Sequence, residues 1–199
     1  MSVSLLHCFG DSLTAGYGAL PKDGWITRTS RAFPSVTFVN HGICGGFFSD
    51  ILLSAAETAA HPAEGEALFL MGGTNDILCG RRLDVIKIFA GEKIRMLSRR
   101  LPLLLATPLL ATKTSVACGW QAEWTFASNQ ETLLSYAAFL RTLAAELCIP
   151  LIDFQKEFPE DDSYYTDGIH PNAEGYALMS RIAAPVLKSF FNLSPAQNQ

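Results

Sequence analysis

The chain has 199 residues, of which 49% are hydrophobic and 17% charged, and its formal net charge is -4. This length suits one domain with a sizeable core, and the mildly acidic balance argues against a nucleic-acid-binding surface. We therefore expect a single domain over residues 1–191, followed by a frayed tail over residues 192–199.

Short apolar runs alternate with amphipathic segments along the chain. The first apolar run predicts a strand over residues 3–9, and a glycine-rich loop separates it from a helix over residues 25–33. A strand over 36–40, a helix over 51–60 and a uniformly apolar strand over 67–71 follow. Next we expect a helix over 83–100 that Gly91 could divide, and a strand over 103–107. An aperiodic segment over 108–126 follows, and then a helix that starts at a capping box over 128–131 and runs to 147. A strand over 151–154 and a helix over 171–191 complete the chain of predicted elements.

The cysteines, the histidines and the longest apolar run bear on metal binding and compartment. Five scattered cysteines without a C-x-x-C pair predict buried free thiols and argue against a disulfide framework or a metal site. We expect His7 and His61 to be structural or exposed, and His41 to support the site or lie at the surface.

The apolar run over residues 101–110 is about half as long as a membrane span. The first strand begins too near Met1 for a signal peptide, so we expect a cytoplasmic protein without a membrane anchor.

Alternation of strands and helices is typical of a parallel sheet with helices on both faces. For five strands we expect a three-layer α/β/α sandwich with the flavodoxin-like order 2-1-3-4-5. In that order the turns after strands 1, 2, 3 and 5 open at the same carboxyl edge of the sheet, where open α/β sheets bind ligands. The phosphate-binding patterns G-x-x-x-x-G-K-[ST] and G-x-G-x-x-G do not occur, which argues against nucleotide binding.

The four turns carry groups suited to acyl transfer. Ser12 supplies a hydroxyl after strand 1, and Asp167 lies three residues before His170, so the carboxylate can orient the imidazole as a general base. The N–H groups of Gly45 and Ser12 and the side-chain amide of Asn75 supply donors for a developing oxyanion. Each feature alone is also typical of an ordinary turn or helix cap. Their occurrence together at one edge favours a serine hydrolase.

The same residues resemble a known family. Four segments are similar, in order and approximate spacing, to the sequence blocks of the SGNH or GDSL hydrolases: residues 10–13 (Gly-Asp-Ser-Leu), 40–45, 73–76 (Gly-Thr-Asn-Asp) and 167–171 (Asp-Gly-Ile-His-Pro). The resemblance covers nearly the whole chain and implies a flavodoxin-like sandwich that hydrolyses esters without a cofactor. It also implies roles for Ser12 as nucleophile, His170 as base, Asp167 as the orienter of that base, and Gly45 and Asn75 as oxyanion donors.

The resemblance leaves the substrate and the pocket open. The family includes lysophospholipases, thioesterases, arylesterases and sugar deacetylases, so a small-molecule acyl ester is the implied substrate. A sugar O-deacetylase, an acyl-CoA thioesterase and a catalytically silent domain that binds a glycan or lipid are alternatives. Cys44 is a further candidate nucleophile, but the sequence places no base beside it and we expect a buried thiol. After Gly45 the chain has Gly46 and aromatic residues where many relatives carry a polar one. Four aromatic residues could line a pocket, or pack on the core instead: Phe47, Phe48, Trp120 and Trp124.

Overall fold

The computed structural model describes residues 3–192 and contains the expected five-stranded parallel sheet. Its strand order is β2-β1-β3-β4-β5, which confirms the order predicted from the sequence. The strands are β1 (Leu5–Gly10), β2 (Thr37–Gly42), β3 (Glu66–Met71), β4 (Leu103–Ala106) and β5 (Leu151–Ile152). Gly10 pairs with Gly42 on one side and with Met71 on the other, so the three strands end at the same level.

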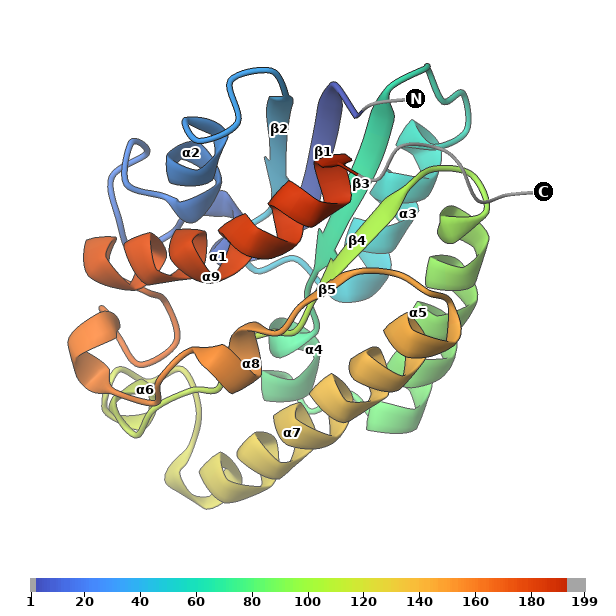
Figure 1. Cartoon of the computed structure of the whole chain (residues 1–199). Coiled ribbons are helices and arrows are strands. Elements are labelled where there is room, and N and C mark those ends of the chain that lie inside the picture. The colour runs from blue at the N-terminus through green and yellow to red at the C-terminus, as the bar shows by residue number, and fades with distance from the viewer. Residues whose placement is uncertain (1–2, 193–199) are drawn as a thin grey trace.

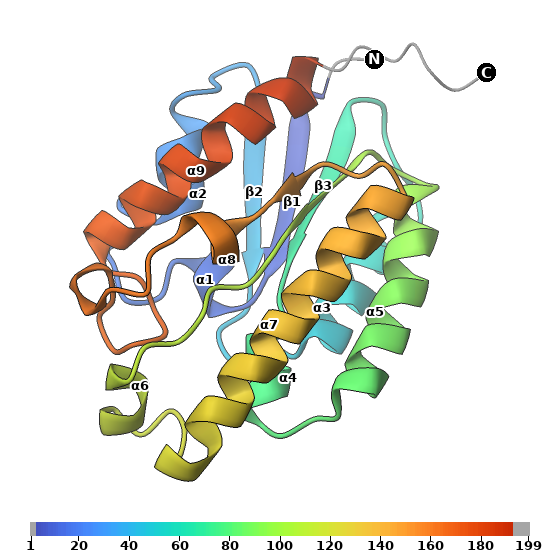
Figure 2. The same ribbon diagram turned by 60° about the horizontal axis from the view of Figure 1, so that its bottom comes forward.

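Helices cover both faces of the sheet, as expected for a three-layer α/β/α sandwich. Helices α2 (Trp25–Ser30) and α9 (Ala173–Asn192) cover one face, and α3 (Phe48–Thr58), α5 (Leu83–Ser98) and α7 (Glu123–Glu146) cover the other (Figures 1 and 2). Each face buries its own apolar core. One core includes Leu6 and Trp25, and the other includes Phe9 and Ile94, because alternate residues of a strand point to opposite faces.

Short helices gather beyond the carboxyl ends of the strands. They are α1 (Ser12–Ala15), α4 (Thr74–Leu78), α6 (Thr114–Ala117), α8 (Phe154–Glu157) and the 3₁₀ turn η1 (Asp162–Tyr164). Figure 2 shows α1, α4 and α6 at this end of the molecule. Three to five residues are too few to show a helical period, so periodicity does not predict these helices.

Helix α7 begins earlier than its sequence predicts. It starts at Glu123, and the expected capping residue Ser128 lies one turn inside it, where its hydroxyl donates to the carbonyl of Thr125 (2.9 Å). The segment expected to be aperiodic over residues 108–126 therefore contains α6 and the first turn of α7. Helix α5 continues through Gly91 without a break.

The expectation of buried cysteines is wrong for most of them. Cys8 is buried in the sheet, but the other four are exposed: Cys44, Cys79, Cys118 and Cys148. These four lie in turns after strands or helices, where sequence composition does not reveal which way a small side chain points.

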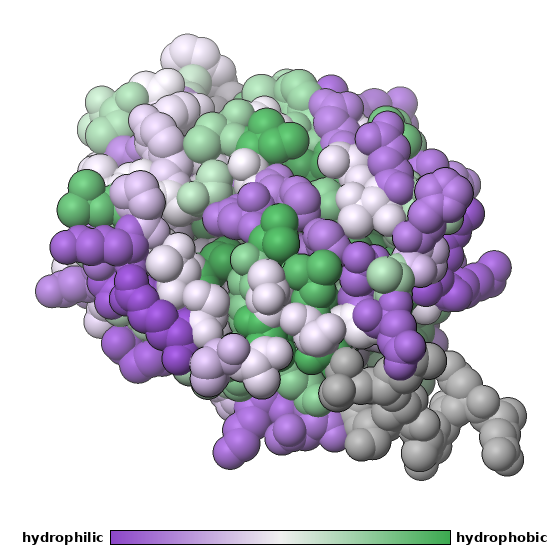
Figure 3. Space-filling model, turned by 90° about the horizontal axis from the view of Figure 1, so that it is seen from above, coloured by the Kyte–Doolittle hydropathy of each residue, from purple (hydrophilic) through white to green (hydrophobic). Residues whose placement is uncertain are grey.

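The end of the molecule that carries the amino ends of the strands shows apolar side chains interspersed with polar ones (Figure 3). Over residues 3–192, no helix combines the length and the apolar character needed to cross a bilayer. The tail expected over residues 192–199 lies outside the described residues except for Asn192, which ends α9.

Candidate active site

Ser12 lies at the carboxyl end of β1, as the first residue of α1. The carboxylate of Asp11 caps this helix by accepting the N–H of Leu13 (3.0 Å). Gly10 is required where strand and helix meet, because a Cβ there would lie 2.0 Å from the Thr14 hydroxyl. The Gly-Asp-Ser segment therefore makes a turn tight enough to aim the serine hydroxyl out of the sheet edge.

Ser12, His170 and Asp167 form a continuous hydrogen-bonded chain. Ser12 Oγ lies 2.9 Å from His170 Nε2, although the two residues are 158 positions apart in the sequence. His170 Nδ1 lies 2.8 Å from Asp167 Oδ2. An ionised carboxylate only accepts hydrogen bonds, so Nδ1 carries the ring proton and Nε2 is free to accept the proton of the serine. The structure thus brings together the three side chains that the sequence singled out.

The turn around Asp167 holds its carboxylate ionised. Burial alone would raise the pKa of Asp167, but hydrogen bonds from the N–H and ring of His170 and from the N–H of Ile169 outweigh it and lower the pKa. Oδ1 accepts the N–H groups of Ile169 (3.1 Å) and His170 (2.8 Å). These contacts leave Oδ2 for the imidazole and fix the direction of the carboxylate.

Three N–H donors expected for an oxyanion lie beside the serine. Within residues 3–192, the backbone N–H groups of Ser12 and Gly45 donate to no protein acceptor. Asn75 Nδ2 donates one hydrogen to the carbonyl of Gly46 (3.0 Å), which leaves its second hydrogen available. Gly45 has a positive φ of 74°, a conformation that glycine adopts without strain. Gly45, Asn75 and Ser12 line the same cavity.

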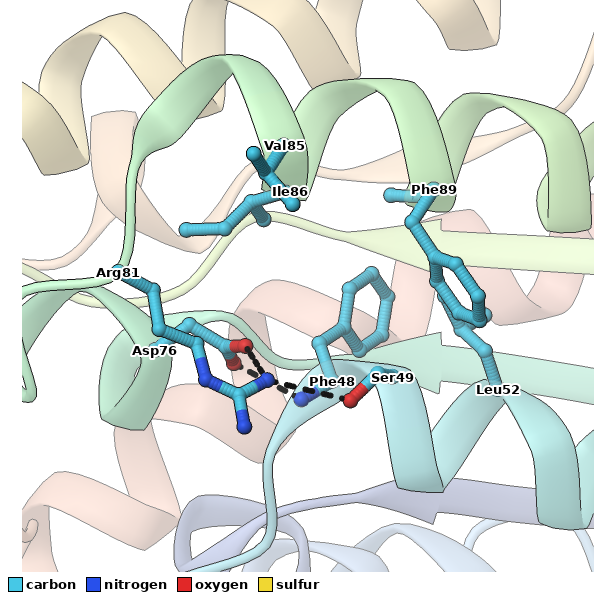
Figure 4. A pocket seen from close by; sticks show the side chains of 9 residues that line it. Phe48, Ser49, Leu52, Asp76, Arg81, Val85, Ile86 and Phe89 are labelled. Carbon is cyan, nitrogen blue, oxygen red and sulfur yellow. Dashed lines mark hydrogen bonds and ion pairs between the residues drawn. The ribbon is translucent and has the colours of Figure 1, made fainter.

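Asp76 ties the Gly45 loop to α4. Its carboxylate accepts the N–H of Phe48, the first residue of α3 (2.8 Å), and also accepts from Arg81 (3.2 Å). Figure 4 shows this group at one end of a second cavity of about 120 Å³ between α3 and α5. The Arg81 guanidinium also stacks on Phe47, 3.6 Å from the centre of its ring. No role is predicted for Asp76 from the sequence, because its contact with Phe48 joins two separate turns.

Two buried carboxylates lie behind the serine. Burial raises the pKa of Asp11 to about 7, the N–H of Leu13 opposes this rise, and the nearby charge of Asp76 adds to it. Burial also raises the pKa of Asp76, although the N–H of Phe48 and the charge of Arg81 lower it in part. Because two neighbouring buried carboxylates repel each other when both are ionised, at least one of them favours the neutral form. This limits the negative charge next to Ser12.

The cavity at Ser12 has a volume of about 130 Å³ and two aromatic walls. Tyr17 and Trp120 line it, with ring centres 4.5 Å and 5.1 Å from the His170 ring. Both rings stand steeply inclined to the plane of the imidazole. Tyr17 was not singled out from the sequence, although its position between two glycines just after Ser12 is a usable signal.

The other aromatic residues expected at the pocket lie elsewhere. Phe48 is buried between α3 and the sheet and lines the second cavity, and Phe47 lies beneath Arg81. Trp124 is 86% exposed on the first turn of α7. The pocket prediction is therefore wrong for these three residues. Cys44 is exposed and lines the Ser12 cavity, so the expectation that it is buried is also wrong.

Over the described residues 3–192, no three His, Cys, Asp or Glu side chains come together as a set of metal ligands. The titratable groups at the Ser12 cavity are instead arranged as a hydrogen-bonded chain from a hydroxyl to a carboxylate.

A flavodoxin-like sandwich with these side chains at its carboxyl edge belongs to the structural class of the SGNH hydrolases. A profile of the GDSL-like lipase/acylhydrolase family matches residues 8–178, and the chain therefore belongs to that family. Membership of this family supports an esterase or acylhydrolase activity in general. A comparison with curated proteins gives no match.

Solved structures share the fold. A member of the lipolytic G-D-S-L family from Veillonella parvula is 27% identical, with a TM-score of 0.79 over 96% of this chain and 100% of that one. A carbohydrate acetylesterase family member from Sinorhizobium meliloti is 21% identical, with a TM-score of 0.76 over 96% and 100% of the two chains. An arylesterase described as putative, from Agrobacterium tumefaciens, is 19% identical, with a TM-score of 0.73 over 94% and 100%.

Proposed function

We propose that the protein is a serine esterase that cleaves carboxylic esters of small molecules through an acyl-Ser12 intermediate. The observation that carries the proposal is the unbroken hydrogen-bonded chain from Ser12 Oγ through His170 to Asp167, with distances of 2.9 Å and 2.8 Å. Such a chain lets a neutral imidazole remove the proton of the hydroxyl, while the carboxylate stabilises the imidazolium that forms.

The reaction follows from the positions of these groups. His170 Nε2 takes the proton of Ser12 as Oγ attacks the ester carbonyl carbon, and the carbonyl oxygen becomes negative. The N–H groups of Ser12 and Gly45 and the Asn75 amide stabilise that oxygen. His170 then gives the proton to the leaving alcohol, and the acyl group remains on Ser12. His170 then removes a proton from a water molecule as the water attacks the acyl carbonyl carbon. The bond to Ser12 Oγ breaks, His170 returns the proton to Oγ, and the acid is released.

The cavity favours a short acyl group. Its volume of about 130 Å³ lies below the range of about 300–1,000 Å³ that is typical of pockets enclosing drug-sized ligands. Since Tyr17 and Trp120 line the cavity and both contact His170, which protonates the leaving group, we place a flat or cyclic alcohol against these two rings. An aryl alcohol and a sugar both meet this description. The preferred substrates are then acetyl or other short-chain esters of such alcohols.

The test combines labelling with kinetics. A fluorophosphonate probe should form an adduct that mass spectrometry places on Ser12, and p-nitrophenyl acetate should be hydrolysed faster than the palmitate ester. Ser12→Ala should abolish both signals without changing the thermal unfolding curve, because within residues 3–192 the Ser12 hydroxyl is hydrogen-bonded to the His170 side chain alone.

Cys44→Ser is the matched control, since this exposed thiol lines the same cavity and could react with the ester by itself. It should leave labelling and turnover unchanged. Full turnover by Ser12→Ala, or its loss in Cys44→Ser, would overturn the proposal. A folded wild-type protein that forms no adduct and hydrolyses no ester would indicate a binding domain instead.

A further inference from the structure

The indole of Trp120 contacts the same carboxylate oxygen that holds His170. Trp120 Nε1 donates to Asp167 Oδ2 at 2.8 Å, and Oδ2 also accepts from His170 Nδ1 at 2.8 Å. The other oxygen, Oδ1, accepts the N–H groups of Ile169 and His170. Four donors therefore surround this carboxylate, and only the indole comes from another part of the chain.

The segment that carries Trp120 is fixed to the Asp167 turn. The N–H of Thr112 donates to the carbonyl of Gly168 (2.8 Å), and a Cβ on Gly168 would lie 2.2 Å from the backbone nitrogen of Ser115. Ser115 is fully buried, and its carbonyl accepts the N–H of Trp120 (2.9 Å). The indole donor is thus positioned by the backbone before any substrate arrives.

A further hydrogen-bonded chain holds the segment from the side of α7. Gln121 Nε2 donates to the Ser115 hydroxyl (2.8 Å), and Asn129 Nδ2 donates to Gln121 Oε1 (2.9 Å). Because Asn129 is part of α7, these contacts join the Trp120 segment to a long helix of the sandwich. The segment is therefore a fixed wall of the site.

We propose that Trp120 is a positioning residue that sets both the direction and the charge of Asp167. This inference rests on the proposed esterase function. The indole N–H holds Oδ2 in line with the imidazole and takes up part of the negative charge of the carboxylate. Asp167 then stabilises the imidazolium enough to assist proton transfer from Ser12, while His170 can still release its proton to the leaving alcohol. The indole ring is also a wall of the cavity, so one side chain both lines the cavity and holds the orienting carboxylate.

Trp120→Phe tests this role, because it removes the N–H and keeps an aromatic wall. We expect kcat for p-nitrophenyl acetate to fall about tenfold, the lower end of the effect of losing a hydrogen bond to a charged group, with KM nearly unchanged. We also expect the acid limb of the kcat/KM profile to move to higher pH by roughly half a unit, because an unshared carboxylate charge favours the imidazolium. Trp120→Ala should show the same change in the profile and, in addition, a higher KM.

Trp124→Phe is the matched control. This tryptophan lies four residues further along and is 86% exposed, so its substitution should leave kcat, KM and the pH profile unchanged. Trp120 is itself 44% exposed, and thermal unfolding should show that both Phe variants remain folded.

An unchanged kcat and acid limb in Trp120→Phe, or an equal loss in Trp124→Phe, would overturn the inference. If either of these outcomes occurs while fluorophosphonate still labels Ser12, the proposed function stands and only the role of Trp120 fails. If wild-type Ser12 is never labelled and no ester is cleaved, the proposed function fails first.

Discussion

Residues 3–192 contain two histidine–carboxylate pairs that differ in what the second ring nitrogen contacts. At the carboxyl edge of the sheet, His170 Nδ1 lies 2.8 Å from Asp167, and its other ring nitrogen lies 2.9 Å from the Ser12 hydroxyl. Within the sheet, His7 Nε2 lies 3.6 Å from Glu66, too far for a hydrogen bond, and its Nδ1 lies 3.0 Å from His41 Nε2.

The difference shows that a histidine beside a carboxylate does not by itself define an active site. His7 and His41 lie on paired strands β1 and β2, and the His41 ring stacks on Phe9 with the ring centres 4.4 Å apart. The second nitrogen of His7 thus meets another imidazole, whereas that of His170 meets a hydroxyl at a helix start. Beside His170, the turn after β1 leaves space for a substrate, and the N–H groups of Ser12 and Gly45 have no protein acceptor within residues 3–192.

Substituting the two histidines separately should give the largest contrast. His170→Ala removes the base, and we expect kcat/KM for p-nitrophenyl acetate to fall at least about 10⁴-fold, as for other catalytic histidines. His7→Gln should leave kcat/KM within about twofold of the wild type, since a substitution away from the reacting groups acts on packing. Comparable losses in both variants would show that the sheet pair takes part in the reaction.

The carboxyl edge could be predicted from the sequence because its signals are local. Apolar runs that stop at a glycine identified the strand ends beside Ser12 and Asn75, and a carboxylate three residues before a histidine identified the Asp167 turn. The right-handed crossover rule and the number of strands then placed these turns on one edge. Each of these steps needs only neighbouring residues and the general rules of parallel sheets.

Contacts between distant turns could not be predicted in the same way. The hydrogen bond from Trp120 to Asp167 joins residues 47 positions apart, and that from Phe48 to Asp76 joins residues 28 apart. Both depend on how loops fold over the sheet edge, which no periodicity records. The start of α7 was misplaced because Ser128 resembles a helix cap in sequence but lies inside the helix.

The turn that carries Asp167 and His170 should tolerate substitution less than a turn elsewhere. Gly168→Ala adds a Cβ 2.2 Å from a backbone nitrogen at a positive φ of 83°, and we expect a loss of about 3 kcal/mol in the free energy of unfolding. Gly80→Ala is the control, because φ is 74° and no atom lies within 4 Å of its Cβ position. It should lose only about 1 kcal/mol.

Chemical denaturation measures both losses, and assays at a temperature where each variant is folded measure the effect on the site. Gly168→Ala should also lower kcat, because the displaced backbone moves Asp167 and His170 away from Ser12. Gly80→Ala should not. Equal losses of stability in the two variants would mean that the Asp167 turn adapts to the added methyl group, and the fixed turn described above would be wrong.

The pair within the sheet should affect the pH dependence of stability more than activity. Burial, with a smaller contribution from the charge of His7, lowers the pKa of His41, so the folded state binds a proton at this ring less readily than the unfolded state. The contribution of the neutral His41 ring to the free energy of unfolding is therefore fully present above about pH 6.5, the ordinary pKa of a histidine. It is lost as the pH falls through the lower pKa of the folded state.

The wild type should lose more unfolding free energy between pH 8 and pH 5 than His41→Gln does. The difference should be less than about 1 kcal/mol, because solvent screens this partly exposed ring. Parallel pH profiles for the two proteins would contradict this, and a changed kcat in His41→Gln would show that the two histidine pairs are coupled.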